Sequence, residues 1–374
     1  MADRDVYADL GVRHVLNAAT TLTSLGGTTL PREVMAAMAS AADSCVSMEE
    51  LHLAAGRRVA TLTRNDAGVV TAGAAAAICL AVLAAVTGGQ PELISRLPTD
   101  DSMERRVVMH RAHRIPYDRA IELVGGQLVE VGNVIQTFEW ELESALQRGA
   151  AAVLWVAGSH LPSTVLSLET TVRIAHGYSI PVIVDAAAQL PPMSNLWHFT
   201  RECGADLAIF SGGKALRGPQ SSGLLLGRAD LVEAARVNAA PFQRLARAMK
   251  VGKEEICGLV AALERYVELD HEAQTVRWAE TVDSWVQELE DVHSVSARRL
   301  DENEAGQPVA RLAVDCGSRS RAGEVTSSLW AQDPRIAVLE VGQFIYVSPD
   351  VMSESEYDHV IGELRKALQR STKG

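Results

Sequence analysis

The sequence predicts an α/β protein in which a mainly parallel β-sheet is covered by helices on both faces. Short runs rich in β-branched residues recur at residues 69–71, 106–109, 128–131, 152–156, 181–184 and 206–210. Segments of helical period lie between them, for example residues 139–147 and 168–176. Apolar strands that alternate with amphipathic helices are typical of a parallel sheet buried on both sides.

The last third of the chain has a different pattern. Residues 253–292 are almost continuously helical, which predicts one long helix that joins two domains. Strand candidates at 309–314 and 343–347, and a final amphipathic helix at 354–368, predict a smaller α+β domain. We therefore expect an N-terminal arm (residues 1–45), a large α/β domain (46–252), and a linking helix with a small C-terminal domain (253–374).

Composition excludes several classes of protein. The 374 residues include 35 Lys and Arg against 47 Asp and Glu, a net charge of −12, so we expect no nucleic-acid or anionic-membrane partner. The most apolar stretch, residues 71–89, is too short and too rich in Ala for a membrane span and predicts a buried helix. Five scattered cysteines and an N-terminus without signal-peptide character favour reduced thiols in a cytoplasmic protein.

The most informative segment is DLAIFSGGKALRGPQSSG, residues 206–223. A strand ends there in a glycine turn that carries Lys214. Flanking glycines let backbone N–H groups approach an anion, and a lysine in a pocket can have its pKa lowered enough to form a Schiff base. Taken alone, the turn also fits a surface loop with a solvated lysine.

Asp185 supplies the context for Lys214. It follows an apolar strand in IPVIVDAAAQLPP, and ligands of open α/β sheets bind outside the carboxyl ends of strands. An aspartate and a lysine at this edge fit pyridoxal 5'-phosphate (PLP): the carboxylate keeps the pyridine nitrogen protonated, and the amine binds the aldehyde. The alternative is a structural ion pair.

A third segment, VVTAGAAAAICLAV, predicts an anion site. A strand followed by Gly73 and Ala74 at the start of a helix directs amide groups toward a phosphate. Ser211, three residues before Lys214, is a natural additional phosphate ligand. Ala/Gly helix starts usually serve packing, so this segment gains meaning only together with the other two.

These segments resemble the fold-type-I (aspartate aminotransferase-like) PLP-dependent enzymes of the bacterial selenocysteine synthase group, in the branch that contains D-glucosaminate-6-phosphate ammonia-lyase. The matching pieces are LNAATTLTSLGG, TAGAAAA, VIVDAAAQLPP, GADLAIFSGGKALRGPQSSGLLLG and MKVGKEEICGLVAALERY, within residues 15–266. The resemblance implies that Lys214 forms the Schiff base and that Asp185 binds the pyridine nitrogen. It also implies that Gly73, Ala74 and Ser211 cradle the phosphate.

The resemblance also implies a residue over the cofactor ring, just after the VVMHRAHR strand. His113 is our choice, with His110 and Arg111 as alternatives, and a hydrogen-bonded loop histidine is the structural interpretation. In the N-terminal segment, Asn17 and Thr20, with Thr21 beside them, are candidate substrate contacts. Turn chemistry explains these N-terminal residues equally well.

The sequence departs from the family pattern at the substrate carboxylate. Many fold-type-I enzymes bind it with an arginine in a C-terminal strand, where FIYVSP places Tyr346. Arg217, beside the glycine loop, is our preferred replacement. Lys250 and Lys253 are candidates for a substrate phosphate, or solvated residues at a helix start. The acidic balance and the lack of an evident tRNA-binding domain argue against selenocysteine synthase activity itself.

We expect an enzyme that removes the α-proton of an amino acid and expels a β-hydroxyl, giving a 2-keto acid and ammonia. Lys214 is the expected base, and either Lys214 or His113 would protonate the leaving group. A racemase or epimerase, a β-hydroxy amino acid aldolase and an aminotransferase would use the same lysine and aspartate. A non-catalytic binding protein is the alternative outside enzymes. Because fold-type-I sites usually borrow residues from a neighbouring chain, we expect at least a homodimer.

Overall fold

The computed structural model describes residues 5–158 and 161–371. The chain forms two compact units. The larger comprises Leu30–Leu269, and the smaller joins the described residues of Met1–Thr29 to those of Asp270–Gly374. These limits differ from the expected boundaries: residues 30–45 and 253–269 lie in the larger unit, and the first residues of the chain belong with the C-terminal ones.

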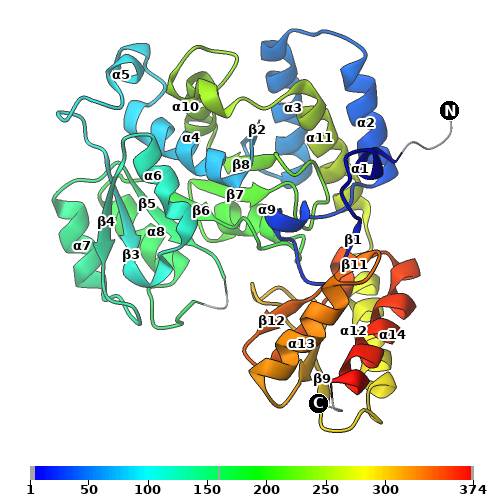
Figure 1. Ribbon diagram of the computed structural model, residues 1–374. Helices are drawn as coiled ribbons and strands as arrows, with labels where there is room; N and C mark the ends of the chain where they lie inside the picture. The colour runs from blue at the N-terminus through cyan, green and yellow to red at the C-terminus, as the bar shows by residue number, and fades with distance from the viewer. Residues whose placement is uncertain (1–4, 159–160, 372–374) are drawn as a thin grey trace. The chain divides into compact units, whose positions relative to one another are not determined.

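A seven-stranded sheet forms the centre of the larger unit, with strand order β2-β8-β7-β6-β5-β3-β4 (Figure 1). Its strands are β2 (Ala67–Thr71), β3 (Arg106–His110), β4 (Gln127–Val131), β5 (Ala152–Val156), β6 (Val182–Asp185), β7 (Leu207–Ser211) and β8 (Gly223–Gly227). β3 to β7 pair in parallel, whereas β8 is antiparallel to both β7 and β2. The expected α/β class is confirmed.

Helices cover both faces of this sheet because the strand side chains alternate. Along β7, Leu207 and Ile209 join one core, whereas Ala208 and Phe210 join the other. The first core contains α4 (Ala74–Thr87), α6 (Arg119–Leu123) and α10 (Ala229–Asn238). The second contains α3 (Met48–Thr63), α7 (Glu139–Gln147), α8 (Leu168–Gly177) and α11 (Lys253–Glu268). α2 (Arg32–Ala42) packs on α11, and α5 (Pro91–Arg96) and α9 (Asn195–Trp197) are short.

The expected long helix over residues 253–292 is interrupted. α11 ends at Glu268, Leu269 is extended (φ −69°, ψ 143°), and α12 (His271–Glu288) begins at once. Asp270 caps α12, since its side chain accepts a hydrogen bond from the Ala273 N–H at 2.9 Å. This cap starts a second helix where the apolar pattern alone would continue the first.

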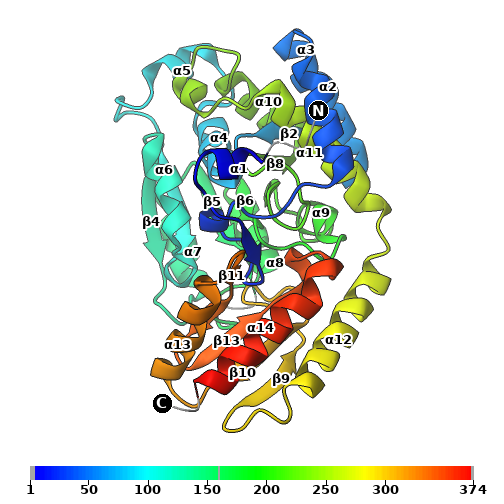
Figure 2. The same cartoon turned by 45° about the vertical axis from the view of Figure 1, so that its right-hand side comes forward.

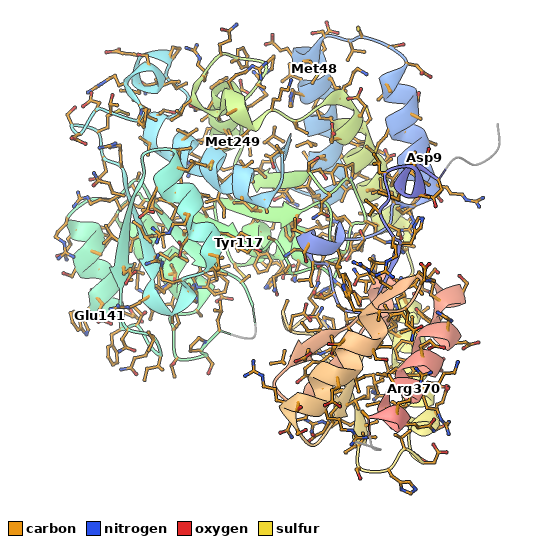
Figure 3. All side chains as sticks on the ribbon, viewed as in Figure 1. Asp9, Met48, Tyr117, Glu141, Met249 and Arg370 are labelled. Carbon is orange, nitrogen blue, oxygen red and sulfur yellow. The ribbon has the colours of Figure 1, made fainter. Side chains whose placement is uncertain are left out.

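The smaller unit contains a four-stranded antiparallel sheet with order β12-β13-β10-β9. Figure 2 labels β13, β10 and β9 of this sheet. The strands are β9 (Ser296–Leu300), β10 (Arg311–Asp315), β12 (Leu339–Val341) and β13 (Phe344–Val347). α12, α13 (Arg319–Trp330) and α14 (Tyr357–Arg370) share one apolar core with one face of this sheet. Arg370, at the end of α14, is labelled in Figure 3.

The N-terminal residues are part of this smaller unit. After α1 (Val6–Asp9), the strand β1 (Val15–Asn17) pairs in parallel with β11 (Arg335–Ala337). The Ser348 N–H also donates to the Ala18 carbonyl oxygen at 2.9 Å. The segment expected to be a separate arm is therefore anchored to the C-terminal part of the chain by backbone hydrogen bonds.

The apolar stretch at residues 71–89 forms α4, as expected of a buried helix. Ile78, Leu80 and Leu83 on α4 are at most 2% exposed. Among residues 5–158 and 161–371, no helix has both the length and the apolar character needed to cross a membrane. All five cysteines carry free thiols.

Candidate active site

Polar residues lie at the carboxyl ends of several strands, along one edge of the large sheet. Thr71 ends β2 and Ser211 ends β7, and both pair with Gly223 at the start of β8. Asp185 ends β6 and pairs with Ile209 of β7. Strand alternation directs the side chains of Thr71, Asp185 and Ser211 to the α4 side of the sheet. The expected meeting of these segments at one sheet edge is what the topology produces.

Asp185 is a buried carboxylate, 5% exposed, beside a lysine. Its Oδ1 accepts a hydrogen bond from the Ala187 N–H at 3.1 Å. Burial raises the pKa of Asp185, and the Ala187 N–H and the positive charge of Lys214 act in the opposite direction. The structure thus places Lys214 close enough to Asp185 to act on its charge. A protonated ring nitrogen bound here would stabilise the charged form of the Asp185 carboxylate.

Lys214 lies in a closed loop rather than an open surface turn. The Gly212 N–H donates to the Ser222 carbonyl oxygen at 2.8 Å, and the Gly218 N–H donates to the Gly212 carbonyl oxygen at 2.8 Å. A Cβ atom at Gly212 would lie 2.1 Å from Ser222 Oγ, so only glycine fits there. These contacts hold the half-buried Lys214 beside the end of β7.

The cradle expected for the phosphate lies at the start of α4. Gly73 has φ 107° and ψ 166°, and no side chain of the described residues caps the first turn of the helix. The Thr71 hydroxyl donates to the Gly73 carbonyl oxygen at 2.9 Å, which fixes the turn. The first amides of α4 are therefore available to an anion. This cradle, together with Lys214 and Asp185, fits PLP.

His113 lies next to the same edge. It is 2% exposed, in the turn η2 (Arg111–His113) after β3, and its Nδ1 accepts a hydrogen bond from the Val156 N–H at 3.2 Å. Val156 pairs with Asp185 across β5 and β6. The His113 ring also meets the Trp155 ring edge-on, with centroids 5.1 Å apart. Sequence reasoning did not find Trp155, because its only signal is a position near a strand end.

The two alternatives to His113 have other contacts. His110 is fully buried, and its nitrogens lie 3.2 Å from Thr137 Oγ1 and 3.4 Å from Thr171 Oγ1. Burial lowers the pKa of His110 to about 4. The Arg111 Nε is 3.3 Å from a carboxylate oxygen of Glu130, and its side chain is mostly exposed. A surface residue also follows in the next turn, η3 (Pro116–Asp118), where Tyr117 is 61% exposed (Figure 3).

Arg217 adopts an unusual backbone conformation. Its φ of 54° lies in the left-handed region, and its N–H donates to the Lys214 carbonyl oxygen at 2.8 Å. A non-glycine residue there costs about 1–2 kcal/mol, and such strain clusters at functional sites. The loop therefore turns back directly after Lys214, as our interpretation of Arg217 requires.

The candidates in the smaller unit make local contacts. The Asn17 side chain donates to the carbonyl oxygens of Thr20 (2.9 Å) and Gly27 (3.1 Å) and accepts from the Ala19 N–H. Thr20 donates from its hydroxyl to Glu304. The Asn17 bonds are turn contacts, the alternative that the sequence left open, whereas the Thr20 bond joins residues 284 positions apart, and a role of either residue in substrate binding stays a prediction.

Tyr346 lies on β13, beside an arginine. The guanidinium of Arg311 is 4.5 Å from the centre of the Tyr346 ring, and Arg311 also pairs with Glu304 at 3.2 Å. In the larger unit, the Lys253 amine donates to the Ala41 carbonyl oxygen at 2.6 Å, which ties α11 to α2, whereas Lys250 is exposed. Lys253 thus has the contacts of a structural residue at a helix start.

Comparison with known proteins places this chain in a family. The chain is 33% identical to D-glucosaminate-6-phosphate ammonia lyase of Salmonella typhimurium over 98% of its length and 99% of that protein. It is 34% identical to a 5'-C-glycyluridine monooxygenase-decarboxylase of a Streptomyces species, over 97% of this chain and 92% of that protein. A solved structure of D-glucosaminate-6-phosphate ammonia-lyase superposes with a TM-score of 0.85 at 31% identity, covering 99% of this chain and all of that one.

The family profile covers most of the chain, since the L-seryl-tRNA selenium transferase (SelA) profile matches residues 15–328. PLP-bound enzymes of 13–14% identity share the fold alone, at TM-scores of 0.60–0.61. The expected resemblance and cofactor are confirmed. The chain belongs to the L-seryl-tRNA selenium transferase (SelA) family, a family of PLP-dependent enzymes of fold type I.

Proposed function

We propose that this protein is a PLP-dependent ammonia-lyase whose substrate is an amino acid with a β-hydroxyl, of the sugar amino acid class and with or without a phosphate. One observation carries the proposal: the buried Asp185 ends β6 and Lys214 follows the end of the neighbouring strand β7, in a chain that matches the Salmonella lyase from end to end. D-Glucosaminate 6-phosphate is itself a 2-amino acid with a hydroxyl on the neighbouring carbon, and this defines the substrate class.

Each residue has a defined role in this proposal. When bound, PLP supplies a ring that accepts electron density from the substrate Cα. Asp185 holds a proton at the ring nitrogen, and the amides at Gly73 and Ala74 bind the cofactor phosphate together with Ser211. Lys214 would take the Cα proton, because the amine that binds the cofactor aldehyde becomes free when the substrate amine replaces it. The β-hydroxyl then leaves as water, and hydrolysis of the resulting enamine releases ammonia and the 2-keto acid.

The experiment offers the purified enzyme D- and L-β-hydroxy amino acids, among them D-glucosaminate 6-phosphate, and measures keto acid and ammonia. Equal amounts of both products, lost in Lys214→Ala, are the expected result. Aldehyde would instead indicate an aldolase, consumption of an added keto acid an aminotransferase, and solvent deuterium at Cα without net product a racemase. Failure of every substrate to react would favour a binding protein.

A second candidate is favoured by the Streptomyces relative, which is as similar to this chain as the lyase is. That relative is named a monooxygenase-decarboxylase. Oxygen uptake and carbon dioxide release are therefore recorded in the same assays, with a glycyl nucleoside among the substrates. Oxygen-dependent loss of carbon dioxide, without release of ammonia, would replace the lyase proposal.

We assign the substrate carboxylate to Arg217. The left-handed backbone at Arg217 returns the chain toward Lys214, whereas Tyr346 cannot form a charged two-pronged contact. Arg217→Ala should lower kcat/KM on the order of 10²-fold, equivalent to about 2–3 kcal/mol for a charge-assisted hydrogen bond, and leave the cofactor absorbance unchanged. Tyr346→Phe should have a much smaller effect. Loss of PLP in the Arg217 variant would instead make this residue a cofactor ligand.

We also propose a cytoplasmic homodimer or higher homo-oligomer. The free thiols of all five cysteines suit a reducing compartment. Val6, Leu10 and Val12 near the N-terminus are 52–76% exposed, an apolar surface that a second chain would cover. Sedimentation should show at least a dimer at assay concentrations, and a fully active monomer would contradict the proposal.

A further inference from the structure

One hydrogen bond determines which nitrogen of His113 can carry a proton. The Val156 N–H points at His113 Nδ1, 3.2 Å away. A backbone amide only donates, so Nδ1 must offer its lone pair and cannot carry hydrogen. A neutral ring then has its proton on Nε2. A second proton, on Nδ1, would break this bond and bring two N–H groups face to face in a site that is 2% exposed.

Two neighbouring rings hold His113 in this orientation. Trp155 meets it edge-on at 81°, and the Trp155 indole N–H donates to the Leu166 carbonyl oxygen at 3.2 Å, which fixes the indole. His110 meets it at 75°, with ring centroids 5.0 Å apart. Rotation of His113 that would exchange its nitrogens requires both neighbours to move. Among charged groups, Asp185 pairs with Val156 in the sheet, and the positive charge of Lys214 opposes the rise that burial causes in the pKa of Asp185. Arg114, which follows His113 in the chain, pairs with Asp118 at 2.5 Å.

We infer that His113 is a fixed neutral imidazole that donates a hydrogen bond through Nε2 and takes no part in proton transfer, with Trp155 as the residue that positions it. Its consequence for the reaction, namely which group protonates the leaving hydroxyl, rests on the proposed function. A neutral imidazole N–H is a very weak acid, so His113 does not protonate the departing hydroxyl. Lys214 does so, returning to the hydroxyl the proton that it took from Cα, and the proton count balances without a second acid.

The first test measures the His113 tautomer directly, without turnover. The full-length chain labelled with [15N]histidine is examined by NMR with and without PLP, and His113→Asn identifies the signal. We expect one protonated nitrogen, Nε2, and no second protonation over the pH range in which a free imidazole becomes charged. A proton on Nδ1, or an imidazolium at neutral pH, would overturn the inference whatever reaction the enzyme catalyses.

The second test compares two variants that carry the same amide group at different reach. Glutamine at position 113 keeps an N–H where Nε2 lies, and asparagine keeps an acceptor where Nδ1 lies. A pure donor role predicts that His113→Gln stays within about tenfold of the wild-type kcat and keeps its cofactor absorbance, whereas His113→Asn loses more. If His113 were the acid, both variants would fall together by about 10²- to 10⁴-fold and one limb of the pH profile would disappear.

Trp155 has its own control. Trp155→Phe keeps a ring edge against His113, and its NMR spectrum should show the same single tautomer. Trp155→Ala removes the edge and should give a mixture of tautomers and a lower kcat with a nearly unchanged KM. A single unchanged tautomer in the alanine variant would show that Trp155 does not position His113.

Discussion

Gly223 offers a sharp test of how the phosphate cradle is built. It begins β8 and faces the turn before α4 through backbone atoms alone. A Cβ atom at Gly223 would lie 2.7 Å from the Gly73 carbonyl carbon and 2.9 Å from the Ala74 nitrogen. Because both neighbours are backbone atoms, no side chain can rotate away to make room. We therefore expect Gly223→Ala to displace the cradle.

The size of the effect follows from these distances. The added methyl group would be well inside ordinary van der Waals contact, so the turn at Gly73 must shift. Overpacking of this kind costs about 1–3 kcal/mol. If the cost falls on cofactor binding, the dissociation constant of PLP rises roughly 5- to 150-fold, since 1.4 kcal/mol corresponds to about a factor of ten.

The assay titrates cofactor-free protein with PLP and follows the cofactor absorbance, with the melting temperature recorded for each variant. Gly177→Ala is the matched control, because a Cβ atom at Gly177, in α8, would meet no atom within 4 Å. The control should keep wild-type affinity and stability. Wild-type affinity in Gly223→Ala, with an unchanged melting temperature, would refute the close contact between β8 and the cradle.

Two further predictions concern buried carboxylates. Because burial raises the pKa of Asp185, ionisation of this carboxyl lowers the free energy of unfolding of the cofactor-free protein as pH rises. Asp185→Asn should therefore melt higher than wild type at pH 8, converge with it below about pH 4, and lose nearly all turnover. A melting point below that of wild type at pH 8 would contradict this sign. Asp206 is 4% exposed and accepts from the Val182 N–H (2.8 Å) and the Arg228 guanidinium (2.6 Å). Asp206→Ala should cost about 1–3 kcal/mol in denaturant unfolding, because it leaves the buried Val182 N–H without its acceptor, whereas the half-exposed Arg228 can be hydrated. The exposed Asp230, also paired with Arg228, is the control, and its alanine variant should cost less than about 1 kcal/mol.

Local sequence pattern was sufficient for the strands and the class of fold. Each of the runs at residues 106–109, 152–156 and 206–210 is mostly apolar and rich in β-branched or bulky residues. Local sequence pattern was insufficient where the position of a strand depends on pairing with distant segments. β8 is a leucine run between glycines that the sequence search passed over, and its antiparallel direction depends on β7 and β2, which lie on either side. Similarly, β1 pairs with β11, more than 300 residues away.

The candidate site could be predicted in part, where a general rule of parallel sheets applies, but not where a long-range backbone contact decides. Asp185 and Lys214 could be found because strand ends of a parallel sheet share one edge, a rule that needs no coordinates. The tautomer of His113 could not, because the group that sets it is a backbone N–H 43 residues away. Every residue has a backbone N–H, so the sequence gives no sign of which one donates to a given side chain. The hydrogen bond from Val156 to His113 could therefore not be predicted, although both residues were known.

The two glycines that meet at the phosphate cradle are glycines for different physical reasons. Gly73 has open space where a Cβ atom would be, but its φ of 107° and ψ of 166° fall in a region that only glycine occupies readily. Gly223 has no such backbone restriction, but a Cβ atom there would strike Gly73 itself. Alanine at position 73 would therefore change the direction of the turn, whereas alanine at position 223 would push an intact turn outward. The glycines, rather than the alanine-rich run after them, are what would let this helix start bind the phosphate in the proposed function.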